Sequence, residues 1–183
     1  FARIGEGSLG GKGRGLAFIG TMVKRYPDWS KDNFDVTIPK TVVICTDIFD
    51  EFMETNELYP VALSDADDNT ILKYFLRASL PGHLIEDLMA FFEVVKSPIA
   101  IRSSSLLEDS HYQPFAGIYS TYMVPKLEDK YEMLRTLSDA IKAVYASVFY
   151  KDSKAYMTAT SNLIDQEKMA VVLQEVVGTR YES

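Results

Sequence analysis

The sequence has few of the residues that define several familiar classes of protein. It contains one cysteine, Cys45, in 183 residues, which excludes an intramolecular disulfide and suits a reducing cytoplasm. No apolar stretch approaches the ~20 residues of a membrane span, and no signal peptide is visible. These absences predict a cytoplasmic protein that does not enter a membrane.

Positive charge and histidine are also scarce. The formal net charge is −7, which argues against a broad nucleic-acid-binding face, so any anionic ligand must be held by local cations. The two histidines, His83 and His111, are isolated and have no metal-ligand spacing, so we expect surface or structural roles for them and no metal site. The apolar content of 47% is that of an ordinary globular domain with a real core.

The chain begins at Phe1 and ends shortly after an apolar run. We therefore expect a piece of a larger multidomain protein, with residues 1–183 forming one partial domain. The acidic stretch at residues 60–69 is the candidate connector between two subdomains.

Hydrophobic periodicity predicts helices mixed with strands. Helices are expected at residues 14–26, 47–55, 70–79, 83–95 and 128–149, with a further short helix at 152–160. Strands are expected at 34–46 (interrupted by Pro39), 97–104, 115–124 and 168–177. Thr46 is expected to cap the helix after it. The fold class is thus α+β (mixed α/β), and the order of strands in the sheet does not follow from the sequence.

The most distinctive segment is "GEGSLGGKGRG", residues 5–15. A dinucleotide pattern, G-x-G-x-x-G, is present at Gly5, Gly7 and Gly10, but only four residues precede it, so the match lacks its strand. A P-loop pattern fails, because Glu6 stands where its first glycine should be and no hydroxyl residue follows the lysine.

What remains is a glycine-rich loop with one cation, Lys12, that runs into a helix. Free N–H groups at a helix amino terminus beside an ammonium group form a reasonable anion site. The alternative is a flexible amino-terminal tail.

Two other segments suggest the same kind of site. In "IAIRSSSLLED", an apolar strand delivers Arg102 at its end, where its guanidinium and the serines after it match phosphate oxygens. The alternative is that Arg102 pairs with Glu108 or Asp109. In "MAVVLQEVV", the strand runs into a segment that could present backbone groups to a purine, or could be strand alone.

Taken in order, these pieces resemble one family. "GGKGRGL", the strand with Pro39, "IAIRSSSLLEDS", "FAGIYSTY", "AIKAVYASVF" and "MAVVLQEVV" are similar to the amino-terminal ATP-binding domain, of ATP-grasp type, of phosphoenolpyruvate synthases and pyruvate phosphate dikinases. The resemblance runs from Gly10 to Val177. It implies the amino-terminal part of an ATP-grasp-type nucleotide-binding domain, truncated in this chain.

The resemblance also implies site residues. Those expected to bind the phosphates of ATP are Lys12, Arg102, Gly11, Gly13, Ser103 and Gly117. Those expected to bind adenine are Gln174, Glu175 and Val177. The cofactors would be ATP and Mg²⁺, with the Mg²⁺ ligands outside this chain, and no catalytic residue is expected within it.

By the same resemblance, the parent enzyme transfers the β-phosphoryl group of ATP to a histidine on a swivelling domain. Another domain, which binds pyruvate, then phosphorylates it. The partners are therefore ATP and these two domains of the same parent chain, and this chain alone is expected to be inactive and to bind ATP weakly.

Two departures keep other functions open. The family usually has Gly-Phe after its Pro-Lys pair, where this chain has Thr41 and Val42, and its phosphate loop usually reads Ser-Phe-Ala-Gly-Gln, where Pro114 and Ile118 stand at the flanking positions. The alternatives are a dikinase-like phosphotransferase with another acceptor, or a non-catalytic nucleotide sensor.

Overall fold

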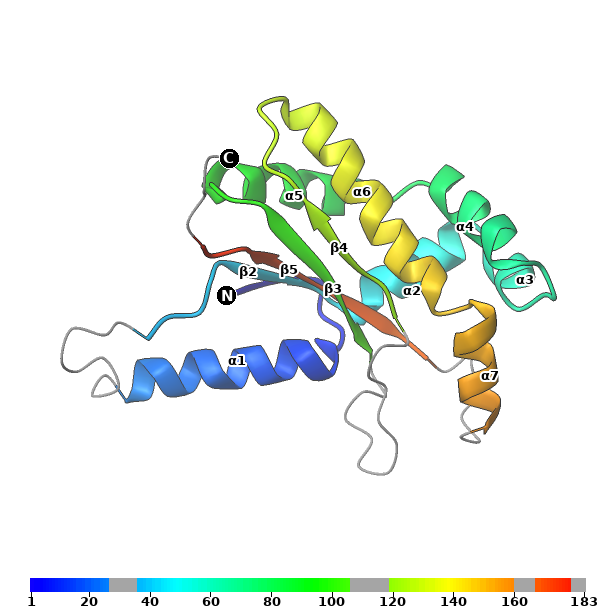
Figure 1. The fold of residues 1–183 in the computed structure, drawn as a ribbon, viewed down its shortest axis with the longest axis horizontal. Helices are drawn as coiled ribbons and strands as arrows, with labels where there is room; N and C mark the ends of the chain where they lie inside the picture. The colour runs from blue at the N-terminus through cyan, green and yellow to red at the C-terminus, as the bar shows by residue number, and fades with distance from the viewer. Residues whose placement is uncertain (27–35, 106–118, 160–166, 179–183) are drawn as a thin grey trace.

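A computed structural model describes residues 1–26, 36–105, 119–159 and 167–178. Figure 1 shows one twisted sheet with helices on both of its faces. The predicted mixed α+β class is confirmed. Within the described ranges, the helices do not combine the length and apolarity that a membrane crossing requires.

The helices and strands that the hydrophobic pattern predicts are present with shifted bounds. The structure adds a short helix at Tyr59–Ala62 and a short strand at Ala2–Ile4, which directly precedes the glycine-rich segment, where none is expected from the sequence. The strands are β1 (Ala2–Ile4), β2 (Thr41–Ile44), β3 (Ile99–Ser105), β4 (Thr121–Val124) and β5 (Met169–Glu175). The helices are α1 (Gly10–Arg25), α2 (Thr46–Thr55), α3 (Tyr59–Ala62), α4 (Asp68–Arg77), α5 (Gly82–Val94), α6 (Lys130–Ser147) and α7 (Lys151–Ala159).

The sheet has the strand order β1-β2-β5-β3-β4, so the last strand of the sequence lies in the middle. β1 and β2 are parallel, whereas β5 is antiparallel to both β2 and β3, and β4 is antiparallel to β3. Val172 of β5 is in register with Val43 on one side and with Arg102 on the other. β5 therefore joins the two halves of the sheet.

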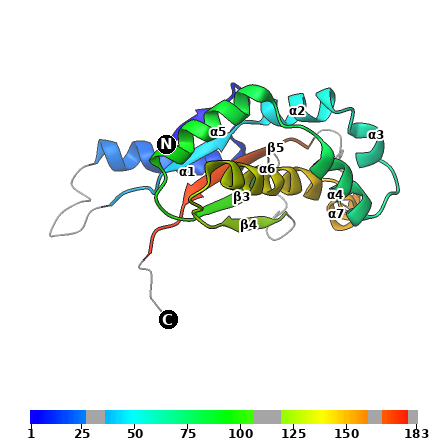
Figure 2. The ribbon, with the colours of Figure 1, turned by 90° about the horizontal axis from the view of Figure 1, so that it is seen from above.

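Most of the apolar core lies on one face of the sheet, where α2, α5 and α6 pack. In Figure 2, α5 and α6 lie over the strands on this side. A cluster of buried rings links the helices, and it consists of Phe49, Phe52, Phe75, Tyr145 and Phe149. Phe52 of α2 packs on Phe75 of α4, so the helices before and after the acidic connector share one core.

Within the described parts of the chain, the opposite face carries a small apolar cluster and a single helix, α1 (Figure 1). Val43, Ala170 and Val172 of the sheet are buried there, and Leu9 and Leu16 pack on them. Because the cluster is small, the strands nearer β4 are left partly uncovered on this face: Met123 is 58% exposed.

Some bounds differ from the sequence-based expectation. α1 begins at Gly10, four residues before the predicted start, so the "GGKG" segment is helix rather than loop. Cys45, not Thr46, is the residue before α2, and the hydroxyl of Thr46 instead accepts a hydrogen bond from the Ser8 N–H at 2.9 Å. The predicted strand at 115–124 is β4 from Thr121, and residues 115–118 lie outside the described residues.

Tyr145 gives a first prediction. Its side chain is fully buried, and among the described residues its hydroxyl has no hydrogen-bond partner; burial raises the pKa of the phenol far above its ordinary value. An unpaired buried polar group costs about 1–3 kcal/mol. We therefore expect Tyr145→Phe to leave the stability unchanged or to raise it by about 1 kcal/mol, as measured by urea denaturation. A loss of more than about 1 kcal/mol would show that the hydroxyl has a partner.

Candidate functional site

The segment before α1 is held by the first turn of α2. The Glu6 N–H donates to Oδ2 of Asp47 at 2.8 Å. Ser8 and Thr46 are joined twice, since the Ser8 N–H donates to the Thr46 hydroxyl and the Thr46 N–H donates to the Ser8 carbonyl at 3.0 Å. These bonds describe an ordered segment and not the flexible tail that the sequence left open.

Asp47 is the anchor of this segment. Gly5 has a φ of +95°, and a Cβ there would lie 2.4 Å from Oδ1 of Asp47, so only glycine allows this approach. Burial alone would raise the pKa of Asp47, but hydrogen bonds from the Glu6 and Gly7 N–H groups favour the charged form, and the net result is a pKa below the ordinary value. Gly5 and Gly7 therefore surround a carboxylate of the protein, where a phosphate would be repelled.

The start of α1 is packed equally closely against β3. Gly10 has a φ of +66°, and a Cβ on it would lie 2.0 Å from the backbone oxygen of Ser104. The Gly10 N–H donates to the Ser8 hydroxyl at 3.1 Å, and the Gly13 N–H donates to the Ser104 hydroxyl at 3.0 Å. The Gly13 N–H, predicted to bind phosphate, is thus engaged by the protein.

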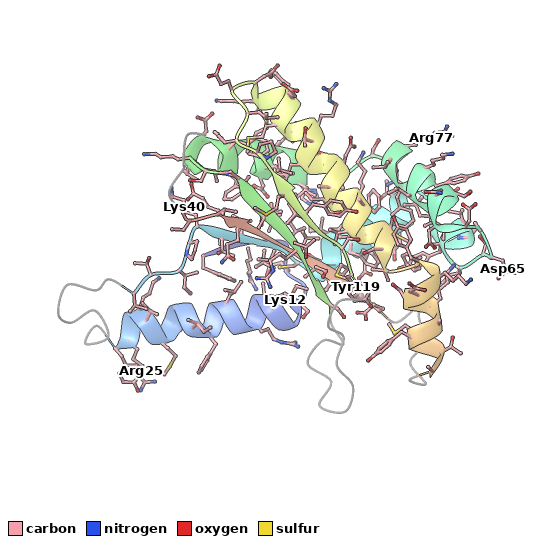
Figure 3. The ribbon with its side chains drawn as sticks, viewed as in Figure 1. Lys12, Arg25, Lys40, Asp65, Arg77 and Tyr119 are labelled. Atoms are coloured by element: carbon pink, nitrogen blue, oxygen red, sulfur yellow. The ribbon has the colours of Figure 1, made fainter. Side chains whose placement is uncertain are left out.

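Lys12 lies on the side of α1 that faces the sheet (Figure 3). It follows Leu9 by three residues and precedes Leu16 by four, so the three side chains share one face of the helix. Leu9 and Leu16 pack on the small cluster that includes Val172. Lys12 is half-buried in the same turn. Gly11 is its neighbour in this first turn.

Arg102 projects from β3 toward the same face. Its register partner is Val172, which belongs to the cluster under α1, whereas its neighbour Ile101 belongs to the large core on the other face. Because side chains alternate along a strand, Arg102 and Lys12 share one face of the sheet. The structure therefore brings together the two cations that the sequence nominated.

The structure separates Ser103, which the sequence predicts to bind phosphate, from its neighbour Ser104. Ser103 is buried on the face opposite Arg102, so the structure does not bring it to the two cations. Ser104, two residues after Arg102, lies on their face and contacts α1. The period of two along a strand was the signal that could have selected Ser104.

Gln174 lies on the same face of the sheet as Arg102, two residues after Val172 on β5. It is in register with Ala100 of β3 and Thr41 of β2, and its side-chain N–H donates to the Thr41 hydroxyl at 3.1 Å. Gln174 is half-buried. It therefore lies between the two cations and the exposed end of the strand, where Val177 is 77% exposed.

The side chain of Glu175 is used inside the protein. One carboxylate oxygen accepts hydrogen bonds from the N–H groups of Lys96 at 2.7 Å and Ser97 at 3.0 Å, and the other lies 3.4 Å from Nζ of Lys40. The backbone N–H bonds to Glu175 lower its pKa from the ordinary value, with a further contribution from Lys40. Its own N–H donates to the Lys40 carbonyl at 2.8 Å.

The remaining predicted residue, Gly117, lies outside the described residues. In the part of the chain that the structure describes, no group of three or more histidine, cysteine or carboxylate side chains is arranged to hold a metal ion. Of the predicted residues, Lys12, Arg102 and Gln174 are the described side chains that lie on one face of the sheet.

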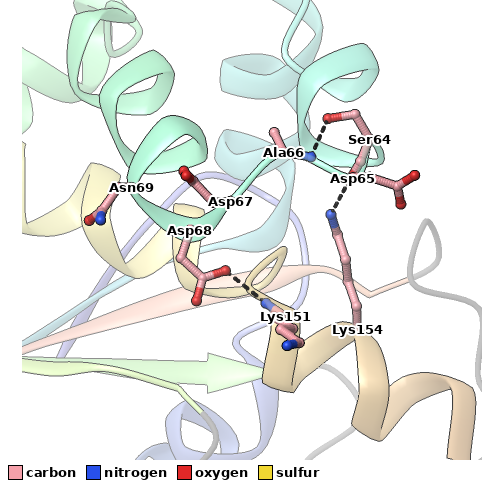
Figure 4. A pocket seen from close by; sticks show the side chains of 8 residues that line it. All are labelled: Ser64, Asp65, Ala66, Asp67, Asp68, Asn69, Lys151 and Lys154. Atoms are coloured by element: carbon pink, nitrogen blue, oxygen red, sulfur yellow. Dashed lines mark hydrogen bonds between the residues drawn. The ribbon is translucent and has the colours of Figure 1, made fainter.

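Two hollows in the surface are lined by other residues. One lies between the acidic connector and α7 (Figure 4), where Lys154 donates to the Ser64 carbonyl at 2.7 Å and the Lys151 N–H donates to Asp68 at 2.9 Å. The other lies between α1 and the segment at residues 36–38. The first is rich in carboxylates and the second is mostly apolar, so neither suits phosphate.

Comparison with known proteins defines the class of this domain. Residues 6–183 match the family described as "Pyruvate phosphate dikinase, AMP/ATP-binding domain", and the chain belongs to that family. It is 28% identical over 142 residues to the "Uncharacterized phosphotransferase YvkC" of Bacillus subtilis, and this match covers 78% of the chain. The chain spans 16% of the length of that relative.

The closeness of Gly10 to β3 predicts opposite effects of alanine at two glycines of α1. Gly10→Ala places a Cβ against the Ser104 backbone and forces a left-handed alanine, which alone costs about 1–2 kcal/mol. Gly15 is the matched control, since a Cβ there meets nothing within 4 Å and alanine favours the helix by roughly 0.5–1 kcal/mol. Urea denaturation of both variants should move the midpoint in opposite directions; a shift in the same direction would refute the packing.

The hydrogen bonds onto Asp47 predict a pH-dependent stability. Because its folded-state pKa is lowered, the stabilisation is complete above the unfolded-state pKa of about 3.9 and is lost as the pH falls through the folded-state pKa. Asp47→Asn should therefore lower the free energy of unfolding at pH 7. The difference from wild type should shrink in urea titrations as the pH is taken below about 3.9. If wild type and Asp47→Asn differed equally in free energy of unfolding at pH 7 and below about pH 3.9, the hydrogen bonds onto Asp47 would not be the cause.

Proposed function

We propose that this chain is the ATP-binding part of a phosphotransferase of the phosphoenolpyruvate synthase and pyruvate phosphate dikinase type. It positions ATP for transfer of a phosphoryl group to a histidine on another domain and then to pyruvate. The observation that carries the proposal is the placement of Lys12 and Arg102 on one face of the sheet, in a chain that belongs to an AMP/ATP-binding family.

The strands suggest how the nucleotide lies. Val172 of β5 lies beside Arg102 and under the face of α1 that carries Lys12. Gln174 follows two residues later on the same strand, and the exposed Val177 lies just after the strand ends. A nucleotide aligned with the strand has its base near Gln174 and the backbone groups of the following residues. Its phosphates then reach the two cations.

This arrangement suits the chemistry. Phosphoryl transfer depends on placing the triphosphate and neutralising charge that spreads over its oxygens. Arg102 offers a planar fork of donors, and Lys12 offers a compact ammonium at the amino end of a helix. Mg²⁺ would bridge the phosphates, with its ligands expected outside this chain, so the chain alone is expected to bind ATP weakly and to transfer nothing.

The rest of the parent protein enters as a proposal. The chain spans 16% of the Bacillus subtilis relative, which leaves room for a histidine-bearing swivelling domain and a pyruvate-binding domain. A second subdomain would complete an ATP-grasp cleft over the open sheet face. The connector near residues 60–69 and the cytoplasmic location stay predictions.

A phosphoryl acceptor other than pyruvate is the alternative that a specific observation supports. Thr41 stands where the family usually has glycine, and its hydroxyl accepts a hydrogen bond from Gln174, one of the residues proposed to face the base. This departure alters the polar groups beside the base. A dikinase-like enzyme with an acceptor other than pyruvate, or a nucleotide sensor without transfer, would retain the same two cations.

The test uses the full-length parent protein with Mg²⁺ and ATP labelled at the β-phosphoryl group. Acid-labile label on the protein is expected for wild type, and its amount at a fixed early time should fall on the order of tenfold or more in Lys12→Ala and in Arg102→Ala. Each variant removes a charge-assisted contact worth about 1.5–3 kcal/mol. Arg77→Ala is the control, because this exposed arginine lies in the last turn of α4, away from the site (Figure 3).

The results of this labelling experiment distinguish the proposed function from its alternatives. Label that survives in both variants would place the site elsewhere while leaving the activity in place. Absence of label with intact ATP binding would favour the sensor. Label transferred to an acceptor other than pyruvate would select the second phosphotransferase.

A further inference from the structure

The Ser104 hydroxyl makes two hydrogen bonds to the first turn of α1. It accepts from the Gly13 N–H at 3.0 Å and donates to the Leu9 carbonyl at 2.8 Å. Ser104 is fully buried, and its backbone oxygen lies 2.0 Å from the position that a Cβ on Gly10 would take, so only glycine fits there. A side chain of β3 is thus enclosed by the start of the helix that bears Lys12.

The two groups that Ser104 joins have a special relation. Gly13 follows Leu9 by four residues, and an N–H and a carbonyl with that spacing are the pair that closes one turn of an α-helix. The hydroxyl therefore acts as part of the first turn of α1. Rotation or sliding of that turn along β3 would break both hydrogen bonds.

This contact couples the elements that carry the two cations. Gly13 is the residue after Lys12 on α1, and Ser104 is two residues after Arg102 on the same face of β3. Among the described residues, the apolar packing on this face is the small cluster under Leu9 and Leu16. A directional contact is therefore needed to fix the register between helix and strand, and Ser104 supplies it.

We infer that Ser104 is a positioning residue for nucleotide binding, whose hydroxyl locks the first turn of α1 to β3 and so holds Lys12 at a set distance from Arg102. The inference rests on the proposed function, because it concerns the same pair of cations. Ser104 itself has no direct contact with ATP in this arrangement, since its hydroxyl is engaged by Leu9 and Gly13.

The neighbouring serine provides a matched control. Ser103 is also buried and differs from Ser104 by one position, but its side chain lies on the opposite face of β3. Removing either hydroxyl deletes one oxygen atom from the same strand. Only the loss of the Ser104 hydroxyl should change the position of Lys12 relative to β3.

The test measures the dissociation constant of Mg-ATP for the full-length parent protein by calorimetry. The variants are Ser104→Ala, Ser103→Ala, Lys12→Ala and the double variant of Ser104 and Lys12. We expect Ser104→Ala to weaken binding about three- to tenfold and Ser103→Ala to change it less than twofold. The Ser104 effect should disappear in the Lys12→Ala background, because Ser104 acts on binding only through the position of Lys12 and a double-mutant cycle measures that coupling.

A purely structural role would give a different pattern. If Ser104→Ala weakened binding by the same factor with and without Lys12, or not at all, the inference would be overturned while the effect of Lys12→Ala still supported the proposed function. If Lys12→Ala left binding unchanged, both the site and the inference would fail.

A second measurement does not require ATP. Amide hydrogen exchange at Gly13 should accelerate in Ser104→Ala and not in Ser103→Ala, because only the former removes the acceptor of that N–H. Ser104→Cys, which keeps the size and a weaker donor, should fall between wild type and alanine in both measurements. Unchanged exchange at Gly13 in Ser104→Ala would overturn the inference.

Discussion

The pairing of β5 with two strands from distant parts of the chain is the constraint on which the rest of the structure depends. β5 is the last strand in the sequence, yet it separates β2 from β3. Val172 at its centre is in register with Val43 and Arg102 and forms the floor on which α1 packs. The first turn of α1 also packs directly on β3 at Ser104, so β5 and β3 together form the surface under the helix that carries Lys12. Because these contacts are so distant in sequence, loop-closure entropy must be lost before they form, and this slows formation of the sheet.

The two faces of this sheet differ in how much apolar side chain they bury. Buried rings from α2, α4 and α6 fill one face, and Phe49 and Tyr145 are at its centre with an edge-on contact of 5.1 Å between ring centroids. On the other face, three small or branched side chains support α1. A face covered so sparingly leaves polar side chains partly accessible near β4 and β5. The large core thus carries most of the apolar burial that offsets the entropy of folding, and the other face contributes less of it among the described residues.

The sequence predicted the elements better than the roles of single residues. The stripe of α6, with Leu137, Ile141 and Val144 fully buried, follows from its periodicity. The glycines were read as a phosphate loop, but Gly10 and Gly5 permit close approach to Ser104 and Asp47, neither of which is near them in sequence. The carboxylate of Glu175 could not be foreseen as an acceptor for backbone N–H groups at residues 96 and 97, because that contact spans almost half of the chain.

Hydrogen bonds, more than apolar area, determine where α1 begins. Its first turn is tied to Ser8 and Ser104, and the segment before it is tied to Thr46 and Asp47. Hydrogen bonds are directional, and each contributes a net of only about 0.5–1.5 kcal/mol. Loss of one such bond would therefore shift the helix before it unfolded the domain, whose large core is on the other face. Placement of Lys12 and stability of the fold are separable properties of this chain, so defects in ligand binding need not be accompanied by unfolding.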